Sequence, residues 1–258
     1  MKQETLLRVF DHAQYVDSIL AQKKEYVRIA TFLVGSQNYG IDTETSDVDT
    51  ISICVPTFIT AALNKEHIAT TLITSADEHA VVKDVRDYIK DGLKKQNVNF
   101  VETLFTEYAD VVPEWKWVYD ELLQLREMIA HYSKFRAIHT ACGMIIRRGK
   151  TAIDTVHHDY DGKQVCTIFR LWHFLRQYLS GCPYEECINI PRHYNMELAL
   201  KKHEVPFDTA KLTVEAFNQN ALELLEEWRN APVDTDSAMD TILDDLVIRI
   251  MKQAWYVK

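Results

Sequence analysis

The stretch that decides the fold is LVGSQNYGIDTETSDVDTISI, residues 33–53. It completes an apolar, β-branched run at 26–34, which predicts a strand that stops at Gly35-Ser36. After a loop, a second predicted strand at 47–55 opens on Asp47-Val48-Asp49. Residues two positions apart point to the same face of a strand, so we expect both carboxylates to project together.

These parts suit phosphoryl or nucleotidyl transfer. Gly35 has no side chain, so backbone N–H groups can approach a phosphate closely, and the Ser36 hydroxyl adds a donor. Two neighbouring carboxylates repel each other unless a cation lies between them, and oxygen ligands favour Mg²⁺ or Mn²⁺. The alternative interpretation is that Asp47 and Asp49 are ordinary residues at a solvated strand entry.

The motif resembles the signature of the DNA polymerase β-like nucleotidyltransferases: Gly35-Ser36, ten residues, then Asp47-Val48-Asp49. Tyr39-Gly40 and Ser46 make it most similar to the predicted nucleotidyltransferases that are associated with RNA ligases. The resemblance covers residues 31–181, strongly over the motif and loosely elsewhere. One departure is Thr50, which follows the second aspartate where the broader pattern prefers an apolar residue.

The resemblance implies Mg²⁺, or Mn²⁺, on Asp47 and Asp49. It implies transfer of an NMP group from a nucleoside triphosphate to an acceptor hydroxyl, with release of pyrophosphate. The acceptor would be an RNA end, a protein or a small molecule. The residues expected to bind the nucleotide are Gly35, Ser36, Tyr39, Ser46, Lys163 and Arg170. The alternative is a nucleotide-binding regulatory protein of the same fold without turnover, of the defence or toxin–antitoxin type.

Enzymes of this kind usually have a third carboxylate on a neighbouring strand, able to take the proton from the attacking hydroxyl. Asp84 ends an apolar run and resembles that position, so we expect it to be the third catalytic carboxylate, with Glu78 in reserve. A helix N-cap explains Asp84 equally well, because aspartate fills that role readily.

Around the motif, the hydrophobic pattern predicts an α+β fold, a small mixed sheet with flanking helices followed by an α-helical domain. A helix over 4–22 comes first, and strands at 68–74 and 79–85 form a hairpin before a helix over 86–96. The later pattern is helical, over 98–108, 115–132, 133–153, 163–179, 212–230 and 238–255. We therefore place a nucleotidyltransferase domain of the polymerase β-like fold at 1–110 and a helical domain at 111–258.

Charge is unevenly distributed along this chain, whose formal net charge is −9. The stretches 128–153 and 163–184 contain Lys and Arg but no Asp or Glu. In the second stretch, a helix would present Lys163 and Arg170 on one face, and Arg makes bidentate contacts with phosphate oxygens. This pattern indicates an anionic ligand held in one place, and solvated basic helix faces explain it equally well.

The remaining features have structural interpretations. Glu102 stands among apolar residues and predicts a buried ion pair, while His157-His158-Asp159 predicts an exposed loop. No apolar run is long enough to cross a bilayer and the start is no signal peptide, so we expect a cytoplasmic protein without a membrane partner. Five cysteines match no standard zinc spacing and suit reduced thiols. They are Cys54, Cys142, Cys166, Cys182 and Cys187.

Overall fold

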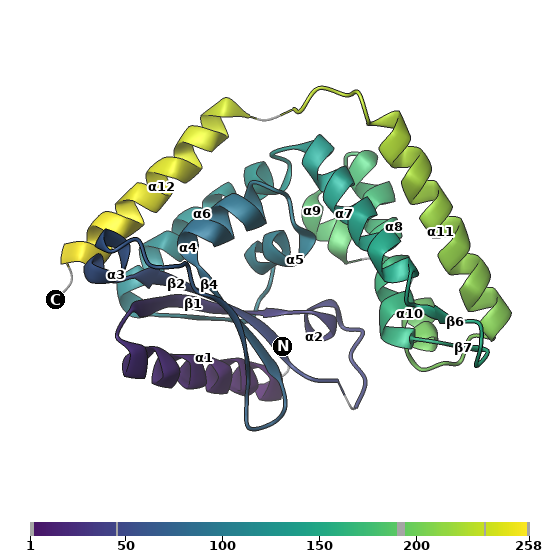
Figure 1. The fold of residues 1–258 in the computed structure, drawn as a ribbon, viewed down its shortest axis with the longest axis horizontal. Coiled ribbons are helices and arrows are strands. Elements are labelled where there is room, and N and C mark those ends of the chain that lie inside the picture. Colours follow the sequence, from purple (N-terminus) through teal and green to yellow (C-terminus); the bar gives the residue numbers. More distant parts are fainter. Residues whose placement is uncertain (1–2, 45, 190–193, 235, 257–258) are drawn as a thin grey trace.

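The computed structural model describes residues 3–44, 46–189, 194–234 and 236–256. Its N-terminal part is a five-stranded mixed sheet with helices, and the rest of the chain is mainly helical (Figure 1). The strand order is β3-β4-β2-β1-β5. The predicted α+β class is therefore confirmed.

The sheet is built around two antiparallel strands, β1 (Tyr26–Val34) and β2 (Asp49–Pro56). β4 (His79–Asp84) lies beside β2 and runs parallel to it, and β3 (Ala69–Ile73) pairs antiparallel with β4. β5 (Ala109–Val111) pairs antiparallel with β1 on the other side. This topology brings the end of β1 and the starts of β2 and β4 to the same end of the sheet.

The fifth strand of the sheet is not predicted by the sequence pattern. The helix expected over 98–108 ends early, because α5 (Val98–Val101) passes into the 3₁₀ turn η2 (Glu102–Leu104). The chain is then drawn alongside β1, where the Leu33 N–H donates to the Tyr108 carbonyl at 2.9 Å. Pairing with the free edge of β1 overrides the helical pattern, since unpaired strand edges attract further strands.

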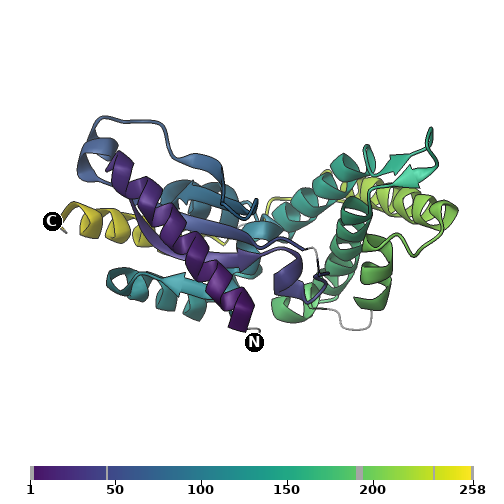
Figure 2. The ribbon, with the colours of Figure 1, turned by 90° about the horizontal axis from the view of Figure 1, so that it is seen from below.

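Helices cover both faces of the sheet. α1 (Gln3–Lys23) lies across one face (Figure 2), where Val16 and Leu20 pack with Tyr26 and Cys54. The opposite face joins the main hydrophobic core through Ile53 and Val55. Because side chains alternate along a strand, Asp49 lies on the side of the main core rather than on the side of α1.

The helices beyond the sheet form two groups. α6 (Lys116–Ala130) packs with the C-terminal α12 (Ser237–Tyr256), which also contacts β2. α7 (Lys134–Gly149), α8 (Gly162–Leu179) and α11 (Phe207–Glu227) pack against one another. In Figure 1 a long connection joins α11 to α12 across the molecule. The C-terminal helix of the chain thus lies against the sheet.

The other elements are short. They are α2 (Ser36–Tyr39), α3 (Phe58–Ala62), α4 (Val85–Asp87), the π-helix η1 (Tyr88–Leu93), η3 (Pro113–Trp115), β6 (Ile153–Asp154), β7 (Asp159–Tyr160), α9 (Tyr184–Ile188) and α10 (Tyr194–Lys201). All five cysteines are free thiols. In the part of the chain that the structure describes, every helix is too short or too polar to span a membrane.

Candidate active site

The bend after β1 lies directly beside the start of β2. Val34 is the register partner of Asp49, so antiparallel pairing brings Gly35 next to the Asp49 carboxylate. Gly35 has φ 77° and ψ −156°, a conformation that favours glycine. A Cβ atom at Gly35 would lie 3.1 Å from Asp49 Oδ2. Backbone conformation and available space therefore both favour glycine at this position.

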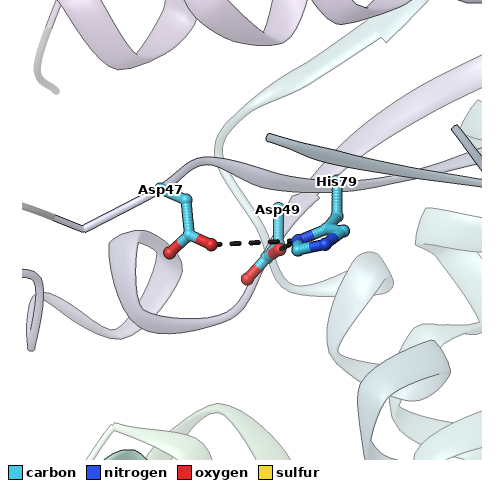
Figure 3. Close-up of side chains that lie close together, drawn as sticks. All are labelled: Asp47, Asp49 and His79. Carbon is cyan, nitrogen blue, oxygen red and sulfur yellow. Dashed lines mark ion pairs between the residues drawn. The ribbon is translucent and has the colours of Figure 1, made fainter. Parts of the chain in front are cut away.

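Asp47 and Asp49 converge with His79 at this end of the sheet (Figure 3). One donor atom from each of the three side chains lies within 4.8 Å of the other two. His79 Nδ1 is 3.5 Å from Asp49 Oδ1 and 3.8 Å from Asp47 Oδ2. The two carboxylates lie together, as strand periodicity predicts, although β2 begins at Asp49 and Asp47 precedes it.

This donor set fits a divalent cation. Burial raises the pKa of Asp49, and the negative charge of Asp47 raises it further, whereas Lys163 and His79 act in the opposite direction. Lys163 Nζ lies 3.6 Å from Asp47 Oδ1, so one cation of the chain already faces the pair. A bound metal ion would offset the remaining repulsion between the two carboxylates.

The segment between the two aspartates is anchored from the α1 face of the sheet. Glu78 is buried, and its Oε1 accepts a hydrogen bond from the Val48 N–H at 2.8 Å. Its Oε2 lies 2.9 Å from His12 Nε2, and Arg8 of α1 forms an ion pair with the same carboxylate. His12 Nδ1 lies 2.9 Å from Thr50 Oγ1. The polar residue after the second aspartate thus has a defined structural role.

A cavity of about 260 Å³ lies between this end of the sheet and the helices α8 and α10. Gly35, Ser36, Tyr39 and Asp49 line it from the sheet side, and Glu102 adds a second carboxylate. Four cations line it from the helical side, and this excess of positive charge suits an anionic ligand. They are Arg148, Lys163, Arg170 and Lys201.

Arg170 is held in the wall of this cavity. Only 9% of it is exposed, which excludes the solvated helix face as an explanation. Its guanidinium lies over the Tyr39 ring, 3.8 Å from the centroid, and its Nη1 is 3.8 Å from Glu102 Oε2. The buried ion pair predicted for Glu102 is confirmed. Burial raises the pKa of Glu102 to about 7, and it raises the pKa of the neighbouring Glu197 to about 7 as well.

Three buried polar atoms in the cavity wall have no hydrogen-bond partner among the described residues, and Arg148 Nε is one of them. The other two are acceptors or can accept. They are the Tyr39 hydroxyl and Glu102 Oε2. The other oxygen of Glu102 accepts a long bond from the Gly35 N–H at 3.4 Å. Buried polar groups in proteins are almost always paired, so these three atoms point to a ligand or an ordered water in the cavity.

A second cavity, of about 510 Å³, adjoins the first, since Lys163 and Lys201 line both. Lys201 Nζ donates to Ser46 Oγ at 2.8 Å and to the Ile41 carbonyl at 3.2 Å. Burial lowers the pKa of Lys201. Ser46 and Asp47 line the second cavity. Ser46 therefore lies in the loop wall beneath Lys201 rather than beside Gly35.

Asp84 is not brought together with Asp47 and Asp49. It pairs with Cys54 at the far end of β4, five residues and roughly 16 Å from His79 at the usual rise along a strand. Its fully buried carboxylate accepts from the Arg86 N–H at 2.8 Å and forms an ion pair with the Arg86 guanidinium at 2.6 Å. The N-cap interpretation of Asp84 is confirmed, and this position gives it no access to the cavity. The reserve candidate, Glu78, points to the α1 face.

Three residues of the site were missed by the sequence analysis: His79, Arg148 and Lys201. His79 opens β4 opposite Asp49, a relation that depends on the parallel register. Arg148 lies in a stretch without Asp or Glu, so local positive charge is the one feature of the sequence that indicated it. The exposed loop predicted at His157-His158-Asp159 is confirmed for the two histidines, which form an exposed turn, whereas Asp159, also exposed, begins β7.

No protein-family model matches the chain, and no curated protein matches it either. The chemistry of the site therefore follows from its own residues. They form a glycine bend, two carboxylates with an imidazole beside them, and a cavity lined by cationic side chains.

Proposed function

We propose that this protein is a metal-dependent nucleotidyltransferase, which moves an NMP group from a nucleoside triphosphate to an acceptor hydroxyl. In this proposal the chain is a divergent member of the DNA polymerase β-like superfamily. The observation that supports it most is the position of the Gly35-Ser36 bend beside Asp49, on the wall of a cavity rich in cations. Nucleotidyl transfer needs a phosphate site, a metal ion and a positive counter-charge close together, and the residues that could provide them lie within this small region.

The triphosphate would lie in the first cavity with its phosphates against Gly35 and Ser36. The Ser36 hydroxyl would donate to a phosphate oxygen, and a phosphate would replace the Glu102 carboxylate as acceptor for the Gly35 N–H. Lys163 and Lys201 line the same wall. Hydrogen bonds that involve charged groups contribute about 1.5–3 kcal/mol each, so a few such contacts suffice for micromolar binding.

Arg170 is held in place before a ligand binds. Its guanidinium rests on the Tyr39 ring and faces the Glu102 carboxylate, so few rotamers remain to be frozen on binding. The planar guanidinium of Arg also matches the geometry of phosphate oxygens. Fixed cations of this kind stabilise negative charge as it develops, without reorganisation during the reaction.

A divalent cation on Asp47 and Asp49 would supply the charge stabilisation that in-line displacement at phosphorus requires. The acceptor hydroxyl would attack the α-phosphorus and lose its proton to water, the bond from that phosphorus to the bridging oxygen would break, and pyrophosphate would leave beside Lys163 and Lys201. The second cavity, which Asp47 also lines, offers a route for the acceptor. The net charge of −9 favours a protein or a small molecule over an RNA end.

The experiment is incubation of the full chain with each α-labelled nucleoside triphosphate, Mg²⁺ or Mn²⁺, and cell extract as a pool of acceptors. We expect label to move to an acceptor, and the double variant Asp47→Asn/Asp49→Asn to abolish the transfer. Glu44→Gln removes an exposed acid from the same loop and serves as the matched control. Transfer that persists in the double variant would refute the mechanism.

The same assay distinguishes this enzyme from the alternative, a regulatory protein that binds nucleotide without turnover. Such a protein would bind the triphosphate in a manner that depends on Asp47 and Asp49, yet release no pyrophosphate with any acceptor.

A further inference from the structure

His79 lies beside Asp49, at the end of the sheet that carries the two aspartates. β2 and β4 run parallel, and their register pairs Thr50 with Ala80. The preceding residues, Asp49 and His79, therefore start adjacent strands side by side. Glu78, one residue earlier, points to the other face and binds the Val48 N–H. A carboxylate is thus available next to this position in the sequence, but the side chain that reaches the aspartates is an imidazole.

The geometry of the three side chains is close to that of an ion site. In an octahedral site with ligands at about 2.1 Å, neighbouring donor atoms lie about 3 Å apart and opposite ones about 4 Å apart. The distances from His79 Nδ1, 3.5 Å to Asp49 and 3.8 Å to Asp47, fall between these values. In Figure 3 the imidazole and both carboxylates point toward one another. All three donor atoms lie within 4.8 Å of one another, so one ion could be shared by the set after a small adjustment of the side chains.

We propose that His79 is the third protein ligand of this cation, and that its imidazole makes the site prefer Mn²⁺ to Mg²⁺. The proposal rests on the proposed function only in that both need a cation on Asp47 and Asp49. Mg²⁺ binds oxygen ligands and keeps much of its water, whereas an imidazole nitrogen suits transition-metal ions. Replacing the expected third carboxylate with a neutral imidazole also removes one negative charge, which weakens the attraction for Mg²⁺.

A different role for His79 would have the opposite consequence. As an imidazolium ion, His79 would act only as a counter-charge for the two aspartates and would compete with a metal ion. Removing it would then strengthen metal binding. If His79 is a ligand, its removal must weaken metal binding, and the loss must be greater for Mn²⁺ than for Mg²⁺. The sign of the change therefore distinguishes the two roles.

The test is a titration of the full chain with Mn²⁺, followed by the electron paramagnetic resonance signal of the free ion, with Mg²⁺ as competitor. We expect His79→Ala to weaken Mn²⁺ binding by at least about 10-fold, because removing even a residue that only supports a metal ligand typically costs about 10–100-fold. His79→Asp restores an all-oxygen set and should lower the preference for Mn²⁺ over Mg²⁺. His67→Ala is the matched control, because His67 pairs with Asp87 at 2.7 Å outside the site.

Spin-echo modulation from the imidazole nitrogen gives a direct readout. It should be present when Mn²⁺ binds the wild-type chain and absent in His79→Ala, with thermal unfolding confirming that the variant is folded. Unchanged or tighter Mn²⁺ binding in His79→Ala, or no nitrogen coupling in the wild type, would overturn the proposal. If Mn²⁺ binding still needed Asp47 and Asp49 in that case, the proposed function would stand. Binding that ignored both aspartates would remove the proposed function as well.

Discussion

The backbone N–H of Val48 donates a 2.8 Å hydrogen bond to Oε1 of Glu78. This bond fixes the peptide between Asp47 and Asp49 from the face opposite the cavity. Glu78 and His79 are neighbours in extended chain, so their side chains point to opposite sides. One anchors the metal-site loop from behind, while the other reaches the carboxylates in front.

We predict that Glu78→Ala weakens Mn²⁺ binding, although Glu78 itself does not contact the ion. The variant leaves the Val48 N–H and His12 without their buried partner, which should lower the free energy of unfolding by about 1–3 kcal/mol. The loosened loop should lower Mn²⁺ affinity by about tenfold. Urea unfolding and metal titration measure both effects, and Glu107→Ala removes an exposed acid as the control. Wild-type metal affinity in Glu78→Ala would contradict the anchoring role.

We predict that Asp84→Asn lowers stability but leaves metal and nucleotide binding unchanged. Asp84 caps α4 and pairs with Arg86, so its replacement should cost about 1–3 kcal/mol of unfolding free energy. Chemical denaturation gives the stability, and calorimetric titration gives the binding. A variant of wild-type stability that had lost nucleotide binding would instead restore Asp84 to the catalytic group.

The pKa of Glu102 predicts how stability depends on pH. The folded protein has a Glu102 pKa of about 7, above the ordinary value of 4.5, because the carboxyl is buried. Between these values the folded chain holds a proton that the unfolded chain has lost, so the unfolding free energy falls as pH rises through this window and levels off above it. The raised pKa corresponds to about 3 kcal/mol.

Glu102→Gln should remove this dependence. Relative to the wild type, the variant should gain about 3 kcal/mol in unfolding free energy between about pH 4 and about pH 8. Urea unfolding at several pH values measures the difference, with Glu107→Gln as an exposed control that should show none. A constant difference across this range would mean that Glu102 ionises normally in the folded protein.

We predict that Lys201→Met weakens triphosphate binding while sparing the metal site. Lys201 lines both cavities and is held by Ser46 and Ile41, so its charge is fixed near the phosphates. The loss should be about 10–100-fold in affinity for a non-hydrolysable triphosphate. The exposed neighbour Lys202 provides the control variant Lys202→Met. Equal losses in both variants would indicate a general effect of charge rather than a contact.

The sequence predicted the parts of this site that depend on neighbouring residues. The strand that ends at Gly35, the bend, and the shared direction of Asp47 and Asp49 follow from patterns within a short stretch, and so does the α+β class. Arg170 and Lys163 were indicated by a helix without acidic residues, and both line the cavity.

The parts of the fold and site that the sequence did not predict depend on contacts between segments far apart in the chain. Choosing the third residue on β4 requires the direction of that strand relative to β2, and the parallel pairing puts His79 at the site and Asp84 at the other end. Lys201 reaches the site from α10, which lies outside the two stretches without acidic residues that indicated basic side chains. The strand β5 arises because the edge of β1 pairs with a three-residue segment that directly follows the helix expected over 98–108 and is too short to show a strand pattern of its own.

The most direct test of the central claim is a crystal structure of the chain with Mn²⁺ and a non-hydrolysable nucleoside triphosphate, with the ion located by its anomalous scattering. We predict one peak at about 2.0–2.4 Å from oxygens of Asp47 and Asp49 and from the His79 nitrogen, with the phosphates against Gly35 and Ser36. A triphosphate bound elsewhere, or an ion held by its phosphates with neither aspartate as a ligand, would contradict it.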